Sequence, residues 1–382
     1  MTISLTDDKK EQLFDLIYTL LHTASPKIRL VVQVLGTMVA AFPGSKYGPL
    51  YYRYLDLDKS KALKENYGNY EATTILSPNA QQELQWWSDN LLNMHNWIHP
   101  PPITHELYTD ASDLAWGACL NDQNTGGAFD PGEVILHINV KELLAIYYAL
   151  RSFVQSLEDS HTKVLSDNTT AVYTINKMGS SKSLNCNETV RLIWQFCRVH
   201  NIWITCAHIP GIENTEADAE SRKSYRDAEW MLNPQIFSHA LRHHRFYPDI
   251  DLFASRLNAQ LDTYVSLRPD PFATFVDAFT LNWNNFNAYI FPPFSMIPRI
   301  LQKLQVDQAT ALVVVPYWPT QAWYTKMVQM TQGCPFFIEP NDTNLLLPNK
   351  PKTKHPLSKQ LTLIIGVMSG ISSSVKDTVT KP

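Results

Sequence analysis

Long hydrophobic runs are absent from this sequence of 382 residues. The longest run near the C-terminus, residues 361–371, is too short to span a bilayer. The N-terminal segment MTISLTDDKK lacks the apolar stretch of a signal peptide. We therefore expect no membrane association and an intracellular location, either cytoplasmic or nuclear.

Paired cysteines and a strong positive charge are also missing. The five cysteines show no CxxC spacing and are odd in number, which argues against a disulfide framework or a structural zinc site. The net charge of −4 argues against holding nucleic acid by bulk charge alone. It leaves open an enzyme that reaches phosphates through metal ions.

The composition is that of a globular chain, with 45% hydrophobic and 18% charged residues. Its length suffices for two or three domains. Residues 1–102 are predicted to be mostly helical, with helices starting after Thr6, at Ile28 and after Ser77. The proline-rich segment HPPPIT (99–104) predicts a stiff linker and a domain boundary.

Residues 104–224 change character, because short strands there precede and alternate with helices. We predict strands over 106–108, 116–120, 163–165 and 203–207, and helices over 140–153, 169–178, 187–200 and 215–222. This order favours a mixed α/β sheet. Residues 230–348 predict a second α/β domain, and residues 349–382 a disordered tail rich in lysine, serine and threonine.

Four acidic residues stand where a strand is expected to end or a helix to begin. Asp110 lies in YTDAS, Glu142 in NVKELLAIYYAL, Asp167 in LSDN and Asp218 in ENTEADAESR. Taken singly, such acids are most often turn or first-turn residues. Two-metal phosphodiester hydrolysis, however, needs carboxylates that converge on ions about 4 Å apart. Mg²⁺ prefers oxygen ligands, so the set of four is a candidate site.

The order TDAS, KELLAI, SDN and HIPGxxNxxAD resembles the type 1 ribonuclease H family, in the form fused to retroelement reverse transcriptases. The resemblance implies a ribonuclease H-like mixed five-stranded sheet with helices. It also implies that the four acids bind Mg²⁺ or Mn²⁺ and that the chain cuts the RNA strand of RNA–DNA hybrids. His208 matches the loop histidine that assists protonation or product release, and Asn168 and Asn214 are expected to contact the substrate.

The flanking regions resemble parts of DIRS-type retroelement polyproteins. Residues 28–59 are similar to the segment that follows the reverse transcriptase palm, leading to a tether with paired tryptophans, here Trp86 and Trp87. YLDLD (54–58) is not interpreted as a polymerase motif, because no acidic palm strand precedes it. Residues 1–102 are thus predicted to be a thumb or tether remnant. The polymerase part of the same polyprotein is an expected partner.

Residues 230–348 contain DLFASR (251–256), FPPF (291–294) and LVVVPYWP (312–319), in an order that resembles an adenine methyltransferase-like domain. In that family the first position of the tetrad is an Asn or Asp that accepts a hydrogen bond from the target amino group. Phe291 cannot accept one, although Phe294 can still stack on a base. The resemblance therefore implies a degenerate domain that does not transfer methyl groups.

Three functions follow as hypotheses. The first is a metal-dependent endonuclease acting on RNA–DNA hybrids, and it is the reading that the four acids favour. The second is an inactive remnant that binds hybrids. It is favoured over the first if the four carboxylates fail to converge. The third is a DNA adenine methyltransferase, which requires a cofactor pocket beside Phe291.

Overall fold

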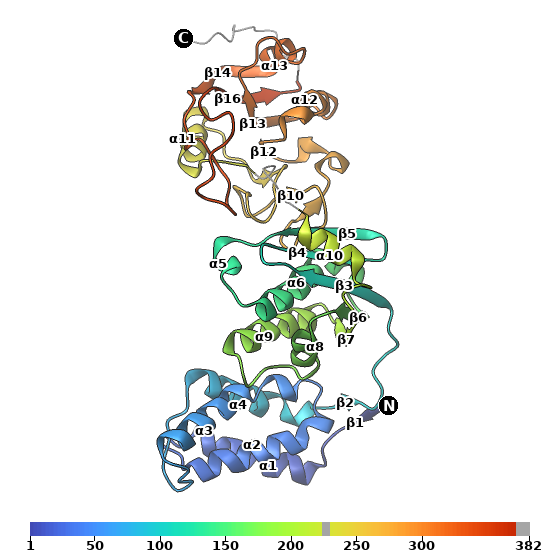
Figure 1. Cartoon of the computed structure of the whole chain (residues 1–382), viewed down its shortest axis with the longest axis vertical. Coiled ribbons are helices and arrows are strands. Elements are labelled where there is room, and N and C mark those ends of the chain that lie inside the picture. The colour runs from blue at the N-terminus through green and yellow to red at the C-terminus, as the bar shows by residue number, and fades with distance from the viewer. Residues whose placement is uncertain (224–229, 372–382) are drawn as a thin grey trace.

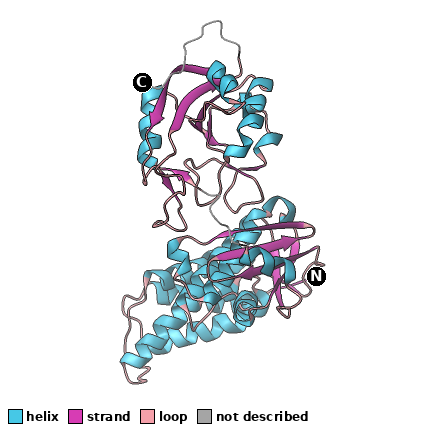
Figure 2. Ribbon diagram, turned by 45° about the horizontal axis from the view of Figure 1, so that its top comes forward, coloured by secondary structure: helices cyan, strands magenta, loops and turns pink. Residues whose placement is uncertain are grey.

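The computed structural model describes residues 1–223 and 230–371. Three units follow one another along the long axis of the molecule (Figure 1). They are an N-terminal helical unit (1–102), a central α/β unit (104–223) and a C-terminal α/β unit (230–371). Figure 2 shows that strands are concentrated in the last two units. No helix among the described residues is long and apolar enough to cross a membrane.

The N-terminal unit is helical, as predicted. Its elements are β1 (Thr2–Ile3), α1 (Asp7–Leu21), α2 (Ile28–Ala41), η1 (Phe42–Gly44), η2 (Gly48–Leu50), α3 (Arg53–Glu65), α4 (Pro78–Asn90), η3 (Leu91–Asn93) and β2 (Asn96–Trp97). The side chain of Ser77 caps α4 by accepting a hydrogen bond from the amide of Ala80. The YLDLD segment lies inside α3, so it is helical.

The helical unit shares one hydrophobic core with the central unit. Trp87 is fully buried in this core, and its indole N–H donates to the carbonyl of Tyr51. Glu83 is also fully buried and pairs with Arg191 of the central unit at 3.1 Å. Burial raises the pKa of Glu83 to about 8. The proline-rich segment at 99–104 therefore links two units that share one hydrophobic core, and it does not divide the chain into units with separate cores.

The central unit is built on a five-stranded sheet in the order β5-β4-β3-β6-β7. Strands β3–β4 and β4–β5 are antiparallel, whereas β3–β6 and β6–β7 are parallel. This confirms the predicted mixed α/β sheet. Its elements are β3 (His105–Ala111), β4 (Ala115–Leu120), β5 (Gln123–Ala128), α5 (Pro131–Val134), α6 (Ile138–Ser152), α7 (Val154–Leu157), β6 (His161–Ser166), α8 (Thr169–Asn176), α9 (Leu184–Val199), β7 (Trp203–His208) and α10 (Thr215–Arg222).

Helix α10 packs unusually closely on strand β4, and a glycine makes this possible. A Cβ atom added to Gly117 would lie 2.3 Å from the carbonyl oxygen of Ala217 and 2.5 Å from the amide nitrogen of Ser221. Only a residue without a side chain fits there. Gly117 pairs directly with Asp110 across the β3–β4 ladder. The close contact therefore holds α10 beside this acid.

The C-terminal unit has its own five-stranded sheet in the order β14-β16-β13-β12-β9. Strands β9, β12 and β13 are parallel, and β16 is antiparallel to both neighbours. Its elements are β8 (Met231–Leu232), α11 (Pro234–His244), β9 (Ile250–Asp251), β10 (Val265–Ser266), β11 (Phe275–Val276), η4 (Ala278–Thr280), η5 (Trp283–Asn285), β12 (Ala288–Ile290), η6 (Phe294–Met296), α12 (Ile297–Val306), β13 (Thr310–Pro316), α13 (Tyr324–Met330), β14 (Thr331–Ile338), β15 (Leu345–Leu346) and β16 (Leu363–Ser369).

The prediction of a disordered tail from residue 349 is wrong for residues 349–371. Strand β16 lies between β13 and β14 and pairs with β13 from Leu363 to Ser369. Most of the apolar run at 361–371 therefore forms a buried strand of the C-terminal sheet. Its apolar composition is explained by its central position, with a paired strand on each side. The lysine- and serine-rich composition of the flanking segments concealed it. Residues 372–382 of the expected tail lie outside the described residues.

Candidate active site

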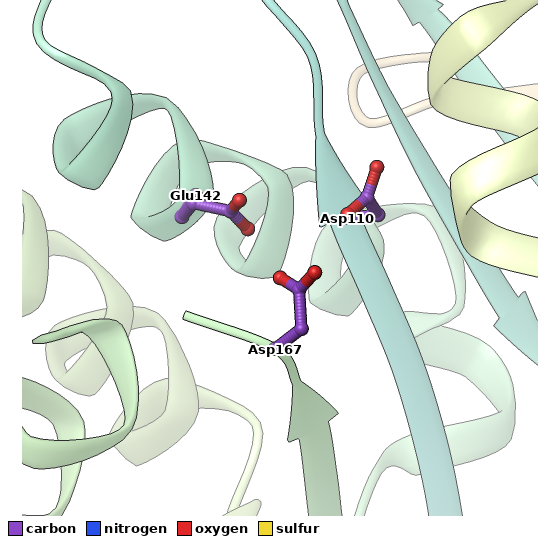
Figure 3. Close-up of side chains that lie close together, drawn as sticks. All are labelled: Asp110, Glu142 and Asp167. Carbon is purple, nitrogen blue, oxygen red and sulfur yellow. The ribbon is translucent and has the colours of Figure 1, made fainter. Parts of the chain in front are cut away.

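Three of the four predicted acids meet at the edge of the central sheet where parallel strands end. Asp110 lies near the end of β3, and Asp167 directly follows β6, the parallel neighbour of β3. Glu142 projects from the N-terminal half of α6. Figure 3 shows the three carboxylates pointing toward one another. The strand order and the helix that covers it thus bring together residues that lie far apart in the sequence.

The three carboxylates are close enough to share an ion. One oxygen from each of Asp110, Glu142 and Asp167 lies within 4.8 Å of the others. Asp110 is 6% and Glu142 4% exposed, whereas Asp167 is accessible. The cluster therefore has a buried floor and one open side.

Burial and the neighbouring negative charges both oppose ionisation of Glu142 and Asp110. Burial and the nearby charges of Asp110 and Asp167 raise the pKa of Glu142 to about 9. Burial also raises the pKa of Asp110, and the neighbouring charges of Asp167 and Asp218 add to this rise. A bound cation would reverse both effects, because it stabilises the ionised carboxylates. The three acids therefore repel one another in the structure.

One oxygen atom of the cluster is direct evidence in favour of a cation site. The Oε2 atom of Glu142 is buried and has no hydrogen-bond partner in the structure. A buried oxygen without a partner is costly unless something else satisfies it. Since all the converging donors are carboxylate oxygens, the set fits a hard divalent cation such as Mg²⁺ or Mn²⁺.

Asp218 lies near this cluster but faces a different partner. It sits in the first turn of α10, and its carboxylate pairs with Arg222 at 2.5 Å. Its charge nevertheless contributes to the raised pKa of Asp110. The next turn of the same helix is tied to the cluster, because the Ser221 hydroxyl donates to the Asp110 carboxylate. The structure thus places Asp218 beside the three acids, held by an arginine.

His208 is exposed at the end of β7, and the loop after it packs against the cluster. The amide of Ile209 donates to the carbonyl of Ser166, directly before Asp167. A Cβ atom added to Gly211 would lie 3.0 Å from a carboxylate oxygen of Asp167. The loop that carries His208 therefore forms one side of the site.

The two asparagines expected at the substrate have different surroundings. Asn168 caps α8, and its amide donates to the side-chain oxygen of Asn139 at 3.1 Å, on a partly accessible surface. Asn214 is only 1% exposed and donates to the carbonyl of Thr109 at 2.9 Å. The substrate contact expected for Asn214 stays a prediction, and in the structure its side chain is buried. This buried amide ties the start of α10 to β3.

Sequence reasoning missed the two α10 residues that contact the acids. Ser221 and Arg222 follow Asp218 by three and four residues, a spacing that places side chains on one helix face. The spacing of Arg222 was a usable signal. The Ser221 contact was not, because it depends on how closely α10 approaches β3.

A second feature lies between the C-terminal and central units, where a cavity of about 650 Å³ opens beside FPPF and is also lined by residues 126–128 of the central unit. It is lined by residues 252–258 after β9 and 291–294 after β12, and Trp116 of the central unit borders it. It thus lies at the carboxyl ends of parallel strands, where open α/β sheets bind ligands. Phe291 offers no acceptor to this cavity, as the sequence predicts.

Comparison with known protein families finds a match within the central unit. Residues 103–195 match the family described as the RNase H-like domain found in reverse transcriptase. No match was found among curated protein sequences. The match includes Asp110, Glu142 and Asp167 and ends before His208 and Asp218.

Several solved structures are similar to parts of the chain. Ribonuclease H1 from the halophilic archaeon Halobacterium salinarum is 18% identical, with 32% of this chain and 98% of that chain covered and a TM-score of 0.28. Foamy viral protease-reverse transcriptase in complex with RNA/DNA hybrid is 14% identical, with 53% and 27% covered and a TM-score of 0.23. The same viral protein in complex with double-stranded DNA is 15% identical, with 54% and 42% covered and a TM-score of 0.22.

The chain thus spans less than half of the viral proteins it resembles. These likenesses are weak, so the assignment rests on the family match together with the strand order and the placement of the acids. On that basis, residues 103–195 match the RNase H-like domain found in reverse transcriptase, and they lie in a unit built on a mixed five-stranded sheet.

Proposed function

We propose that this chain is a metal-dependent endonuclease that hydrolyses the RNA strand of RNA–DNA hybrids. One observation carries the proposal. Carboxylate oxygens of Asp110, Glu142 and Asp167 converge within 4.8 Å, in a domain that matches the reverse transcriptase RNase H-like family. Three carboxylates that face one another repel unless a cation lies between them, so the arrangement suits ion binding better than a purely structural role.

In this proposal Asp110, Glu142 and Asp167 hold Mg²⁺ or Mn²⁺. Such ions lower the pKa of an attacking water and stabilise the leaving oxygen of a phosphodiester. Asp110 faces the other two acids and accepts a hydrogen bond from Ser221, which orients its carboxylate. The buried floor of the cluster excludes water behind Glu142. The open side at Asp167 admits the scissile phosphate.

The remaining predicted residues complete the site from its rim. Asp218 is the proposed fourth ligand, and it becomes available when Arg222 turns away to a phosphate of the substrate. Arg222 is well placed for this exchange, since its side chain is 72% exposed. His208, exposed on the adjacent loop, is proposed to move a proton or assist product release. Asn168 is proposed to contact the nucleic acid beside the acids.

The test is cleavage of a labelled RNA–DNA hybrid in Mg²⁺ by the full chain, with double-stranded DNA and double-stranded RNA of the same sequence as controls. We expect cuts in the RNA strand of the hybrid alone. The competing function is an inactive hybrid-binding remnant. Binding of the hybrid without cleavage in Mg²⁺ or Mn²⁺ would favour the remnant.

We further propose that the chain is part of a retroelement polyprotein of the DIRS type, with the polymerase part of that polyprotein as its partner. The core that the helical unit shares with the central unit supports this, because a tether that packs on the nuclease is expected to position it. Co-purification of the chain with the polymerase segment of such an element is the test. Failure of the two to associate would count against the partnership.

For the C-terminal unit we propose a methyltransferase-like domain that does not transfer methyl groups. The cavity beside FPPF supports a binding role, and Phe291 argues against transfer. A target amino group placed there would lack an acceptor, at a cost of about 1–3 kcal/mol. The test is incubation with labelled S-adenosylmethionine and adenine-containing DNA. Incorporation of label above background would instead support a DNA adenine methyltransferase.

A further inference from the structure

The C-terminal unit inserts an arginine into the central unit. Arg256 follows β9, and its guanidinium donates to both carboxylate oxygens of Glu133, at 2.8 and 2.9 Å. It also donates to the carbonyl of Ala128 at 2.9 Å and to the hydroxyl of Tyr148 at 3.1 Å. The side chains of Arg256 and Glu133 are each only 12% exposed. Four hydrogen bonds thus join the two units at one buried position.

The segment after β10 adds a second set of contacts. The Thr125 hydroxyl donates to the carbonyl of Pro269, and Arg151 donates from Nε to the carbonyl of Pro271 at 2.8 Å. The ring of Phe272 lies 4.2 Å from the Arg151 guanidinium. This segment therefore covers β5, the edge strand of the central sheet. Figure 1 shows the C-terminal unit seated on this side of the central unit.

These contacts reach the two helices that carry Glu142 and Asp218 of the candidate site. Tyr148 and Arg151 lie on α6, which bears Glu142. Arg268 of the C-terminal unit lies 3.4 Å from Glu220 on α10, the helix that bears Asp218. A helix is a rigid element, so contacts at one turn restrain the next.

We infer that the C-terminal unit is a positioning element for the nuclease site, acting through an interdomain clamp made of Arg256, Arg268 and residues 269–272. The clamp holds α6 and α10 in the positions that bring Glu142 into the cluster and keep Asp218 beside it. The inference rests on the proposed function for what the site binds. Arg256 is its principal positioning residue, because its bidentate pair is buried and fixes both distance and orientation.

A buried ion pair contributes more to specificity of arrangement than to stability, since desolvation offsets much of its attraction. This suits a clamp. The Arg256 guanidinium is held by acceptors on Glu133, Ala128 and Tyr148 of the central unit. The Arg256–Glu133 pair joins residues that lie 123 positions apart in the sequence, and it acts together with Arg268 and residues 269–272 in arranging the two units.

The test compares Arg256→Met with Arg299→Met in the full chain. Arg299 belongs to the same unit but is exposed, and its guanidinium lies over the ring of Phe279 of that unit. The first readout is hydrogen exchange without metal. We expect faster amide exchange in α6 and α10 of Arg256→Met, with α9 unchanged, and no change in Arg299→Met. Unchanged exchange in α6 and α10 of Arg256→Met would overturn the inference.

The second readout is Mn²⁺ affinity measured by calorimetry. We expect Arg256→Met to weaken it roughly tenfold, the lower end of the range for residues that support metal ligands. Lower thermal stability with unchanged Mn²⁺ affinity would show a merely structural contact and overturn the inference. If Arg256→Met folds poorly, the double variant Glu133→Gln/Arg256→Met removes both charges and is expected to show the same weakening.

The two proposals fail in different ways. A wild-type chain that neither binds Mn²⁺ nor cleaves a hybrid contradicts the proposed function. The exchange comparison still decides the clamp in that case, because it needs no ion. A chain that cleaves normally with Arg256→Met at every Mg²⁺ concentration contradicts the clamp and leaves the proposed function standing.

Discussion

The central and C-terminal units are both built on five-stranded sheets, and each places a buried carboxylate where a parallel strand ends. In the central unit Asp110 meets two other acids, and the Oε2 atom of Glu142 has no hydrogen-bond partner. In the C-terminal unit Asp251 accepts hydrogen bonds from the amides of Phe253 and Gln260, at 3.3 and 3.1 Å.

The difference separates a structural acid from a ligand. Burial raises the pKa of Asp251 to about 7, but backbone donors satisfy both of its oxygens. Such an acid organises the turn after its strand. The central acids instead face one another, and burial and mutual repulsion raise the pKa of Glu142 to about 9. Carboxylates that remain unsatisfied by the protein indicate a missing positive partner.

The largest expected effect comes from removing charge at the centre of the cluster. Asp110→Asn keeps the shape of the side chain but weakens the ligand that faces both other acids. We expect hybrid cleavage to fall on the order of 10⁴-fold or more, as for essential catalytic groups. The matched change Asp251→Asn should lower cleavage far less, by no more than about tenfold, because Asp251 contacts the turn that carries Arg256 and not the three acids. Equal losses of cleavage in the two variants would contradict the distinction between a ligand and a structural acid.

A smaller effect is expected at the rim. His208→Ala removes a group that moves a proton or releases product but holds no ion. Cleavage should slow roughly 10²-fold, the lower range for general acid–base catalysis, and residual activity should remain. Thermal stability should be unchanged because His208 is exposed. A complete loss equal to that of Asp110→Asn would contradict the separate roles.

The pH dependence of stability offers a subtler contrast. The folded pKa of Glu142 is raised from 4.5 to about 9, so the folded state binds the proton more tightly than the unfolded chain. In metal-free protein this contribution is fully present below about pH 4.5 and is lost as pH rises through 9. Glu142→Gln should flatten the decline, as measured by thermal denaturation in chelator from pH 5 to 9. A decline as steep in the variant as in the wild type would contradict the assignment.

The smallest expected effect on cleavage is at Asn214, whose buried amide donates to Thr109. Asn214→Ala leaves that carbonyl unsatisfied, so the free energy of unfolding should fall by about 1–3 kcal/mol. The KM for hybrid should change little, because the side chain does not reach the surface. A raised KM with unchanged stability would support the substrate role expected from the sequence.

Much of the central unit was predictable because its pattern is local. The helix at Thr215–Arg222 and the strands that carry Asp110 and Asp167 follow from spacing and from the position of each acid. Strand β5 was not predictable, since QNTGGA has no alternation of apolar residues and pairs through its backbone with β4.

The other features that could not be predicted from the sequence depend on long-range contacts. The apolar run of β16 became interpretable only when its neighbours β13 and β14 were known. The pairing of Arg256 with Glu133 joins segments whose local patterns carry no sign of it. The convergence of three acids was predictable as a motif, whereas the ion pair between Arg222 and Asp218 was not predicted.

Direct titration with Mn²⁺ tests the central claim that the acids of the central sheet form a divalent-ion site and Asp251 does not. Calorimetry on metal-free wild type, Asp110→Asn and Asp251→Asn at neutral pH compares the two. The account predicts saturable binding in the wild type and in Asp251→Asn, and loss of that binding in Asp110→Asn. Binding that Asp110→Asn retains, or that Asp251→Asn abolishes, would contradict it.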